Sequence, residues 1–220
     1  MAISVYYELA APESFKDPDV VRVLEATRKR AISQHFGVVS ALNRQVAEGR
    51  LTFCIPSPFQ TGGVIKVLPT TGFWFNVQLA HSSDSASVGL CRFPTMIRAA
   101  GREIQSGLGT GWHFQGSCRT QNPSQRNFDE FRKRHAGLVD LLATLQGHGV
   151  EADVEDDGDF WTARDAGVLE EKFRGELEAG PLLDEAFANA LVGRAPERRP
   201  TLFASALRGQ FLAQFTKRAK

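Results

Sequence analysis

Residues 111–165 constrain the fold more than any other stretch of the chain. Apolar and polar residues alternate over 111–121 and again over 150–155, and apolar residues recur at steps of three and four between 127 and 146. Alternation with a period of two indicates a strand with one buried face, and steps of three and four indicate a helix with one buried face. The order strand, helix, strand predicts a βαβ unit with the helix on one face of a sheet.

The ends of this helix carry the residue types that favour capping. Asn127 is an N-cap residue, and Glu130 three positions later completes a capping box. Gly147 and Gly149 follow the last apolar position, as is common at helix C-termini. The predicted buried face of the helix consists of Phe128, Phe131, His135, Leu138, Leu142 and Leu145.

His135 stands at a position of this buried face where the spacing calls for leucine. One interpretation is a core histidine that is hydrogen-bonded to the backbone. The other is a histidine beneath the sheet whose pKa is displaced by burial, as part of a site between the helix and the strand ends.

The two strands of the unit should each have one polar face. The apolar face, which includes Trp112, Phe114, Val150 and Val154, should lie beneath the helix. The opposite face would form a polar surface, either a binding floor or acid–base site or an ordinary solvated face of a sheet. The residues on this face would be His113, Gln115, Arg119, Gln121, Glu151, Asp153 and Glu155.

The remaining pattern predicts an α+β fold with a mixed sheet of about six strands and helices on one face. Further strands are expected at 3–9, 51–55, 64–68, 73–79 and 87–93, one or two helices at 17–49 with an interruption at Gly37, and a short helix at 96–104. After residue 165 the pattern is helical only. We therefore expect an α+β core domain at 1–165 and a helical C-terminal extension at 166–220 that packs on the core.

Charge is balanced over the whole chain but not along it. The formal net charge is +1, whereas a nucleic-acid-binding domain usually shows a strong basic excess. Residues 151–185 include 13 acidic and 3 basic residues, and residues 193–220 include 7 basic and 1 acidic residue. These segments could face each other, solvate helices or meet a charged partner. The last predicted helix, with a Phe/Leu stripe and basic residues, could pack on its own domain, a partner groove or an anionic membrane surface.

Several classes of site and location are disfavoured by the sequence. Cys54, Cys91 and Cys118 are odd in number and widely spaced, which argues against a disulfide framework or a zinc site and favours a reducing compartment. The chain has no signal-peptide pattern and no apolar run long enough for a membrane span, so we expect a soluble, cytoplasmic protein. The acidic run 156–159 does not match a calcium loop, and no cofactor or metal is expected.

One run of residues resembles a family of uncharacterised bacterial proteins. The similar elements are CRTQ at 118–121, NF at 127–128, His135, LVDLL at 138–142 and DDGDFWTARD at 156–165. The resemblance covers about fifty of the 220 residues and implies no known activity. It implies that the following residues form one cluster: Arg119, Gln121, His135, Asp157, Trp161 and Arg164. The chain departs from the family between residues 121 and 127, where NPSQR replaces a glycine-containing loop.

Two functions follow as hypotheses. The first is a binding protein, for example of an immunity or regulatory kind, that uses the polar sheet face or the charged C-terminal segments to contact a protein partner, with a small-molecule ligand as an alternative. The second is a small hydrolase-like enzyme with a histidine and a carboxylate near the ends of strands 111–121 and 150–155. The candidate residues are His113, Arg119, Gln121, His135, Asp153, Glu155, Asp157, Trp161 and Arg164.

Overall fold

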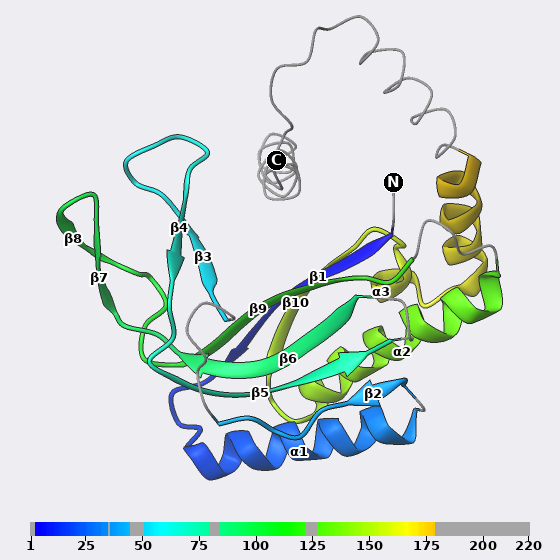
Figure 1. The fold of residues 1–220 in the computed structure, drawn as a ribbon, viewed down its shortest axis with the longest axis horizontal. Coiled ribbons are helices and arrows are strands. Elements are labelled where there is room, and N and C mark those ends of the chain that lie inside the picture. The colour runs from blue at the N-terminus through cyan, green and yellow to red at the C-terminus, as the bar shows by residue number, and fades with distance from the viewer. Residues whose placement is uncertain (1–2, 35, 45–50, 80–83, 122–126, 179–220) are drawn as a thin grey trace, which may run out of the picture.

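The computed structural model of the protein describes residues 3–34, 36–44, 51–79, 84–121 and 127–178 (Figure 1). Six strands form one sheet in the order β10-β1-β9-β6-β5-β2, and β3-β4 and β7-β8 form two separate hairpins. The strands are β1 (Ser4–Ala11), β2 (Val38–Val39), β3 (Phe53–Pro56), β4 (Val64–Val67), β5 (Thr71–Gln78), β6 (Ser85–Arg92), β7 (Met96–Ala99), β8 (Arg102–Gln105), β9 (Trp112–Arg119) and β10 (Glu151–Asp156). The helices are α1 (Asp17–Ser33), α2 (Phe128–Gly147) and α3 (Phe160–Ala163).

The predicted α+β class and the main sheet of about six strands are confirmed, but the sheet is not mixed. Every pairing between described strands is antiparallel. The first strand of the chain, β1, pairs with β9 on one side and β10 on the other. The predicted βαβ unit is therefore split, because the two strands that run parallel are separated by an antiparallel strand from the other end of the sequence.

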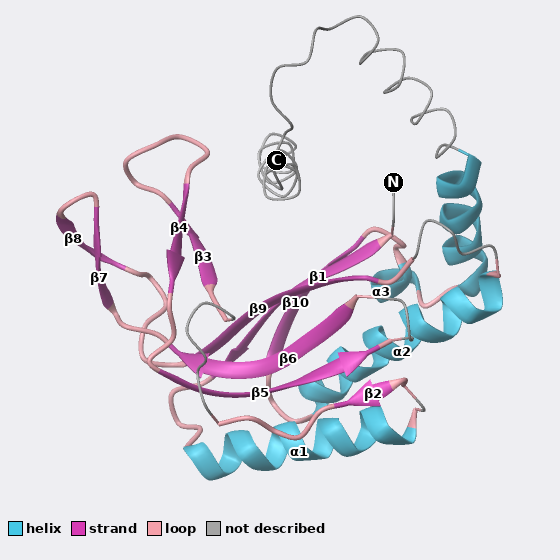
Figure 2. Ribbon diagram, viewed as in Figure 1, coloured by secondary structure: helices cyan, strands magenta, loops and turns pink. Residues whose placement is uncertain are grey.

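Helices α1 and α2 cover one face of the sheet, as predicted (Figure 2). The buried side chains of β1 are Val5, Tyr7, Leu9 and Ala11, and the residues between them are half-buried or exposed. Helix α2 buries seven residues against this layer, including Phe131, His135 and Leu142. The core therefore lies between the helices and the sheet. No helix in the described ranges is long and apolar enough to cross a membrane.

Helix α1 ends earlier than the sequence pattern predicted. It begins at Asp17, with Pro18 in the first turn and the side chain of Asp19 accepting a hydrogen bond from the Lys16 backbone N–H. It ends at Ser33. The predicted helical continuation toward residue 49 is wrong over residues 36–44, since β2 pairs there with β5 at the edge of the sheet; residues 45–50 lie outside the described ranges.

A β-hairpin replaces the short helix predicted at 96–104. Ala100 and Gly101 have φ values of 50° and 77° and connect β7 to β8 as a two-residue turn, a connection in which both residues need positive φ. Ile97 and Ile104 face each other across the hairpin. Their separation of seven residues resembles helical spacing, which explains why the sequence pattern was misleading here.

The described part of the C-terminal extension packs on the core. Residues 166–178 are helical, and Leu169 and Phe173 are buried in a small apolar cluster with Ile3 and Phe131. The helices predicted at 182–191 and 201–215 lie outside the described residues.

The Tyr7 side chain, on β1, crosses over Gly116 on β9 and reaches β6. Its hydroxyl, on β1, donates a hydrogen bond of 2.6 Å to the backbone carbonyl of Ser87 on β6. A Cβ atom at Gly116 on β9, the strand between them, would lie 2.5 Å from the Tyr7 ring. Burial raises the pKa of Tyr7 above its usual value, so the hydroxyl stays protonated and available as a donor.

Gly116→Ala should destabilise the fold, because the added methyl group would displace the Tyr7 ring and weaken its hydrogen bond to Ser87. We expect a loss of about 1–3 kcal/mol in the free energy of unfolding, measured by urea titration. The matched control is Gly175→Ala on the helix at 166–178, where an added Cβ meets no atom within 4 Å and alanine should be neutral or stabilising. Equal effects of the two substitutions would contradict this account of Gly116.

Candidate functional site

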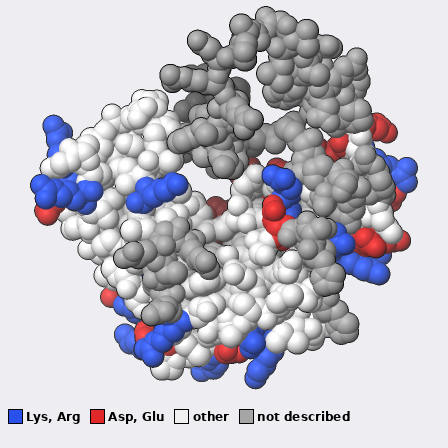
Figure 3. Space-filling model, viewed as in Figure 1, with Lys and Arg blue, Asp and Glu red and all other residues white. Residues whose placement is uncertain are grey.

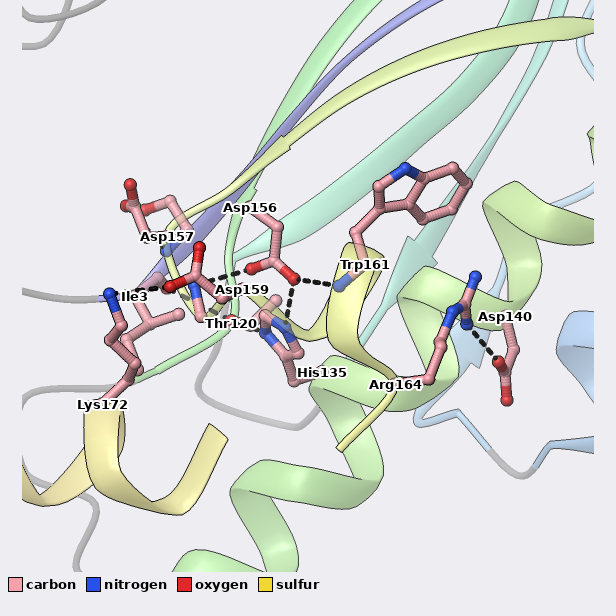
Figure 4. A network of polar contacts seen from close by, with 12 residues as sticks. Ile3, Thr120, His135, Asp140, Asp156, Asp157, Asp159, Trp161, Arg164 and Lys172 are labelled. Atoms are coloured by element: carbon pink, nitrogen blue, oxygen red, sulfur yellow. Dashed lines mark hydrogen bonds and ion pairs between the residues drawn. The ribbon is translucent and has the colours of Figure 1, made fainter. Parts of the chain in front are cut away.

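The structure divides the nine predicted site residues between two places. His113, Arg119, Asp153 and Glu155 belong to strands β9 and β10. The other five lie around the end of the sheet where β9 and β10 finish and β1 begins; Figure 4 shows four of them, and the hydrogen bond from Ile3 N places Gln121 there. These five are Gln121, His135, Asp157, Trp161 and Arg164.

A buried hydrogen-bonded network connects His135 to Thr120 and Asp156 (Figure 4). Nε2 of His135 lies 3.1 Å from Oδ2 of Asp156, and Nδ1 lies 2.9 Å from the hydroxyl oxygen of Thr120. The side chain of His135 is 0% exposed and that of Asp156 is 2% exposed. The network joins three elements, since Asp156 ends β10, Thr120 follows β9 and His135 comes from α2.

Asp156 is held in its ionised form. Burial alone would raise the pKa of this carboxyl group. The hydrogen bond and electrostatic interaction with His135, together with the backbone N–H groups of Gly158 and Trp161, outweigh that effect and lower the pKa below its usual value. Gly158 N donates to Oδ1 at 2.7 Å and Trp161 N donates to Oδ2 at 2.8 Å. An ionised carboxylate only accepts hydrogen bonds, so Nε2 of His135 is the donor.

Both ring nitrogens of His135 are therefore engaged inside the protein. A general base must reach the proton that it removes, directly or through one water. Since His135 and Thr120 are both fully buried, this geometry does not present the ring to an external substrate. The network instead connects the sheet to α2 through buried hydrogen bonds. This is closer to the interpretation of His135 as a core histidine, although His135 bonds to side chains and not to the backbone.

Gln121 and Asp157 hold the start of β1. The Gln121 side chain accepts a hydrogen bond from Ile3 N at 3.2 Å, and the Asp157 side chain accepts one from Ser4 N at 3.2 Å. The predicted position of Gln121 on the polar sheet face is wrong, because β9 ends at Arg119 and the Gln121 side chain is buried against Ile3.

Two ion pairs surround the network on the protein surface. The Arg164 guanidinium lies over the Trp161 ring, 5.1 Å from its centroid, and donates to Asp140 on α2 at 3.0 Å. Lys172 lies 2.8 Å from Asp159, and this hydrogen bond and charge raise the pKa of Lys172. These contacts attach the end of α3 to α2, and the helix at 166–178 to the turn after β10.

The second place is the sheet face opposite the helices, and it is acidic. Cross-strand registers put Glu8 opposite Asp153, Tyr6 opposite Glu155 and Ala10 opposite Glu151. Residues directly opposite each other share a face. The four carboxylates are all exposed, and we call them the acidic face: Glu8, Glu151, Asp153 and Glu155.

No cation neutralises the acidic face among the described residues. None of its four carboxylates takes part in an ion pair with them. Glu8 and Asp153 are like charges directly opposite each other, an arrangement that destabilises a sheet. Arg119 is engaged elsewhere, 3.9 Å from Asp84.

A glutamine links the acidic face to the β3–β4 hairpin. Gln115 on β9 donates to Glu8 at 2.7 Å and accepts a hydrogen bond from Cys54 N on β3 at 2.9 Å. His113 on the same strand face packs edge-on against the Phe53 ring. In the space-filling view, the surface is hollowed between the two hairpins and the six-stranded sheet, and an acidic side chain lies inside the hollow (Figure 3).

Comparisons with known proteins add no family to this description. No protein-family model matches the chain, and no curated protein or solved structure is similar enough to count as a match. The resemblance noted in the sequence stays a prediction. Within the described ranges, no group of three or more His, Cys, Asp or Glu residues is arranged to hold a metal ion.

The sequence pattern missed Thr120 and Asp156, although a signal for both was present. Each lies two residues beyond the last apolar residue assigned to its strand face, which is Cys118 for Thr120 and Val154 for Asp156. The alternation therefore predicts that both point toward the helix, on the same side as His135. His135, Thr120 and Asp156 each occupy a position where the pattern of their element calls for an apolar residue. Three such polar residues on elements that pack together indicate a buried hydrogen-bonded network.

Asp156→Asn should destabilise the protein by about 3 kcal/mol at pH 7, since it removes a buried carboxylate that accepts three hydrogen bonds and leaves their donors without a charged partner. The lowered pKa gives the sign of the pH dependence. The carboxylate stabilises the fold above its unfolded pKa near 3.9, and this contribution is lost as the pH falls through the lower folded value. Urea unfolding should therefore show a smaller difference between wild type and variant at pH 3 than at pH 7.

The control for this experiment is Asp153→Asn, on the same strand but on the acidic face. It makes the same chemical change at an exposed position, so its effect at pH 7 should stay within about 0.5 kcal/mol. A loss of stability as large as that of Asp156→Asn would show that the buried network has no special role.

Proposed function

We propose that this protein is a binding protein whose acidic face contacts a positively charged segment of a protein partner. The observation that carries the proposal is the exposed, like-charged arrangement of Glu8, Asp153 and Glu155 on one sheet face, with no cation beside them among the described residues. A partner that brings Lys or Arg side chains to this face would relieve the repulsion between opposing carboxylates.

The surroundings of the acidic face favour protein binding. Gln115 connects Glu8 to the backbone of β3. These hydrogen bonds hold the β3–β4 hairpin in position beside the acidic face. The hairpin and its flanks carry exposed apolar side chains at Phe59, Val64 and Leu68. Charged groups steer association and fix register, while burial of apolar surface is the dominant favourable contribution to most protein–protein association. This combination suits a partner segment with both basic and apolar side chains.

The hydrolase hypothesis receives less support from the same geometry. His135 uses both ring nitrogens inside the core, and its acidic partner is Asp156, not Asp153, Glu155 or Asp157 as that hypothesis assumed. His113 lies against Phe53, and none of the ion pairs between described residues joins it to a carboxylate. A binding role needs neither histidine.

The proposal is tested by capture of partners from a bacterial lysate with the full-length protein as bait. We expect at least one protein to be retained by wild type and reduced about tenfold by the double variant Asp153→Asn/Glu155→Gln. Raising the salt from about 0.1 M to 1 M shortens the Debye length from about 10 Å to 3 Å and should release the same protein.

The matched control is Glu13→Gln/Glu103→Gln, which removes two exposed carboxylates outside the acidic face. It should retain the partner at the wild-type level. If all three baits retain the same proteins in the same amounts, the acidic face is not a binding surface and the proposal fails.

A further inference from the structure

The described chain ends close to the strands that carry the acidic face. The helix at 166–178 is fixed by Leu169 and Phe173 against Ile3, just before β1, and by Lys172 against Asp159, just after β10. The remaining 42 residues of the chain therefore start at this end of the sheet. Residues 179–200 could span about 70 Å if extended, which is ample to reach any part of the acidic face.

The sequence of residues 201–220 complements the acidic face in charge. It includes four basic residues and no acidic residue, and the basic residues are Arg208, Lys217, Arg218 and Lys220. Its large apolar residues recur in steps of four at Phe203, Leu207, Phe211 and Phe215. Such spacing predicts a helix with one apolar stripe, the form in which a short segment commonly docks in a groove.

We infer that residues 201–220 dock on the acidic face of the same chain and compete there with the external partner. The basic side chains pair with Glu8, Asp153 and Glu155, and the apolar stripe lies toward the exposed apolar residues of the β3–β4 hairpin. The competition, but not the docking itself, rests on the proposed function, which supplies the external partner for the same surface.

Attachment to the same chain makes a weak contact sufficient. Attachment within one chain gives a tethered segment an effective concentration of about 1 mM. A segment with a Kd of about 0.1 mM as a free peptide would then occupy the face about 90% of the time. An external partner must compete with this occupancy, which lowers its apparent affinity for the acidic face. The segment would therefore exclude partners that bind the face only weakly.

Zero-length carbodiimide cross-linking of the full-length wild-type protein tests the inference. The reagent joins a lysine amine to a carboxylate in direct contact, and mass spectrometry identifies the linked residues. In an equal mixture of ¹⁴N- and ¹⁵N-labelled protein, we expect Lys217 or Lys220 to link to Glu8, Glu151, Asp153 or Glu155 within single-isotope chains. These links should fall at least fivefold in 1 M NaCl.

Three outcomes would overturn docking within one chain. Links from Lys217 and Lys220 mainly to carboxylates away from the acidic face, such as Asp129 or Glu130 on α2, would place the segment elsewhere. Links mainly between ¹⁴N and ¹⁵N chains would show that a second copy supplies the segment. Absence of any link to the acidic face would mean that the segment does not contact it.

A full-length variant separates this inference from the proposed function. Arg208→Gln/Lys217→Gln/Arg218→Gln should weaken the internal contact and raise partner capture at least threefold, because the acidic face is then more accessible. Unchanged capture that still depends on Asp153 and Glu155 would leave the binding function standing and reject the internal competitor. Cross-links to the acidic face without any partner that depends on Asp153 and Glu155 would reject the external-binding function alone.

Discussion

The buried contact between His135 and Asp156 is the interaction on which the architecture of this protein most depends. It joins the last residue of β10 to the middle of α2, and Thr120 extends it to the end of β9. A buried carboxylate is costly unless it is paired and fully hydrogen-bonded. Asp156 meets that condition with three donors, and the surrounding turn is shaped by the need to supply them.

The sheet consequently has two polar regions with different physical roles. On the helix side, every polar atom described in the network has a partner, and the region fixes the positions of strands and helices. On the opposite side, exposed carboxylates are placed opposite one another without cations among the described residues. The repulsion between the exposed carboxylates of Glu8 and Asp153 can be relieved by a cationic ligand. A charge that already has a partner within the protein offers a ligand no such gain, so the repulsion is the better indication of a binding surface.

The sequence was sufficient to predict local structure where periodicity was strong. The strands at β5, β6, β9 and β10 and the length of α2 follow from spacing, and its Asn127 cap follows from residue type. It could not place β1 between β9 and β10, because pairing partners more than a hundred residues apart leave no local pattern. The buried network was half predicted. The spacing places His135 on the buried face of α2, as observed, whereas Asp156 was overlooked because the alternation of β10 was not followed past Val154.

The central position of β1 also has a consequence for how the chain is made. Ser4 pairs with Arg119, and Val5 pairs with Asp156, so β1 is synthesised long before either of the strands with which it pairs. Pairings of such high sequence separation slow folding, because loop-closure entropy is lost before they form. Until β10 is synthesised, one edge of β1 has no partner strand, and unpaired strand edges in incompletely folded chains favour aggregation.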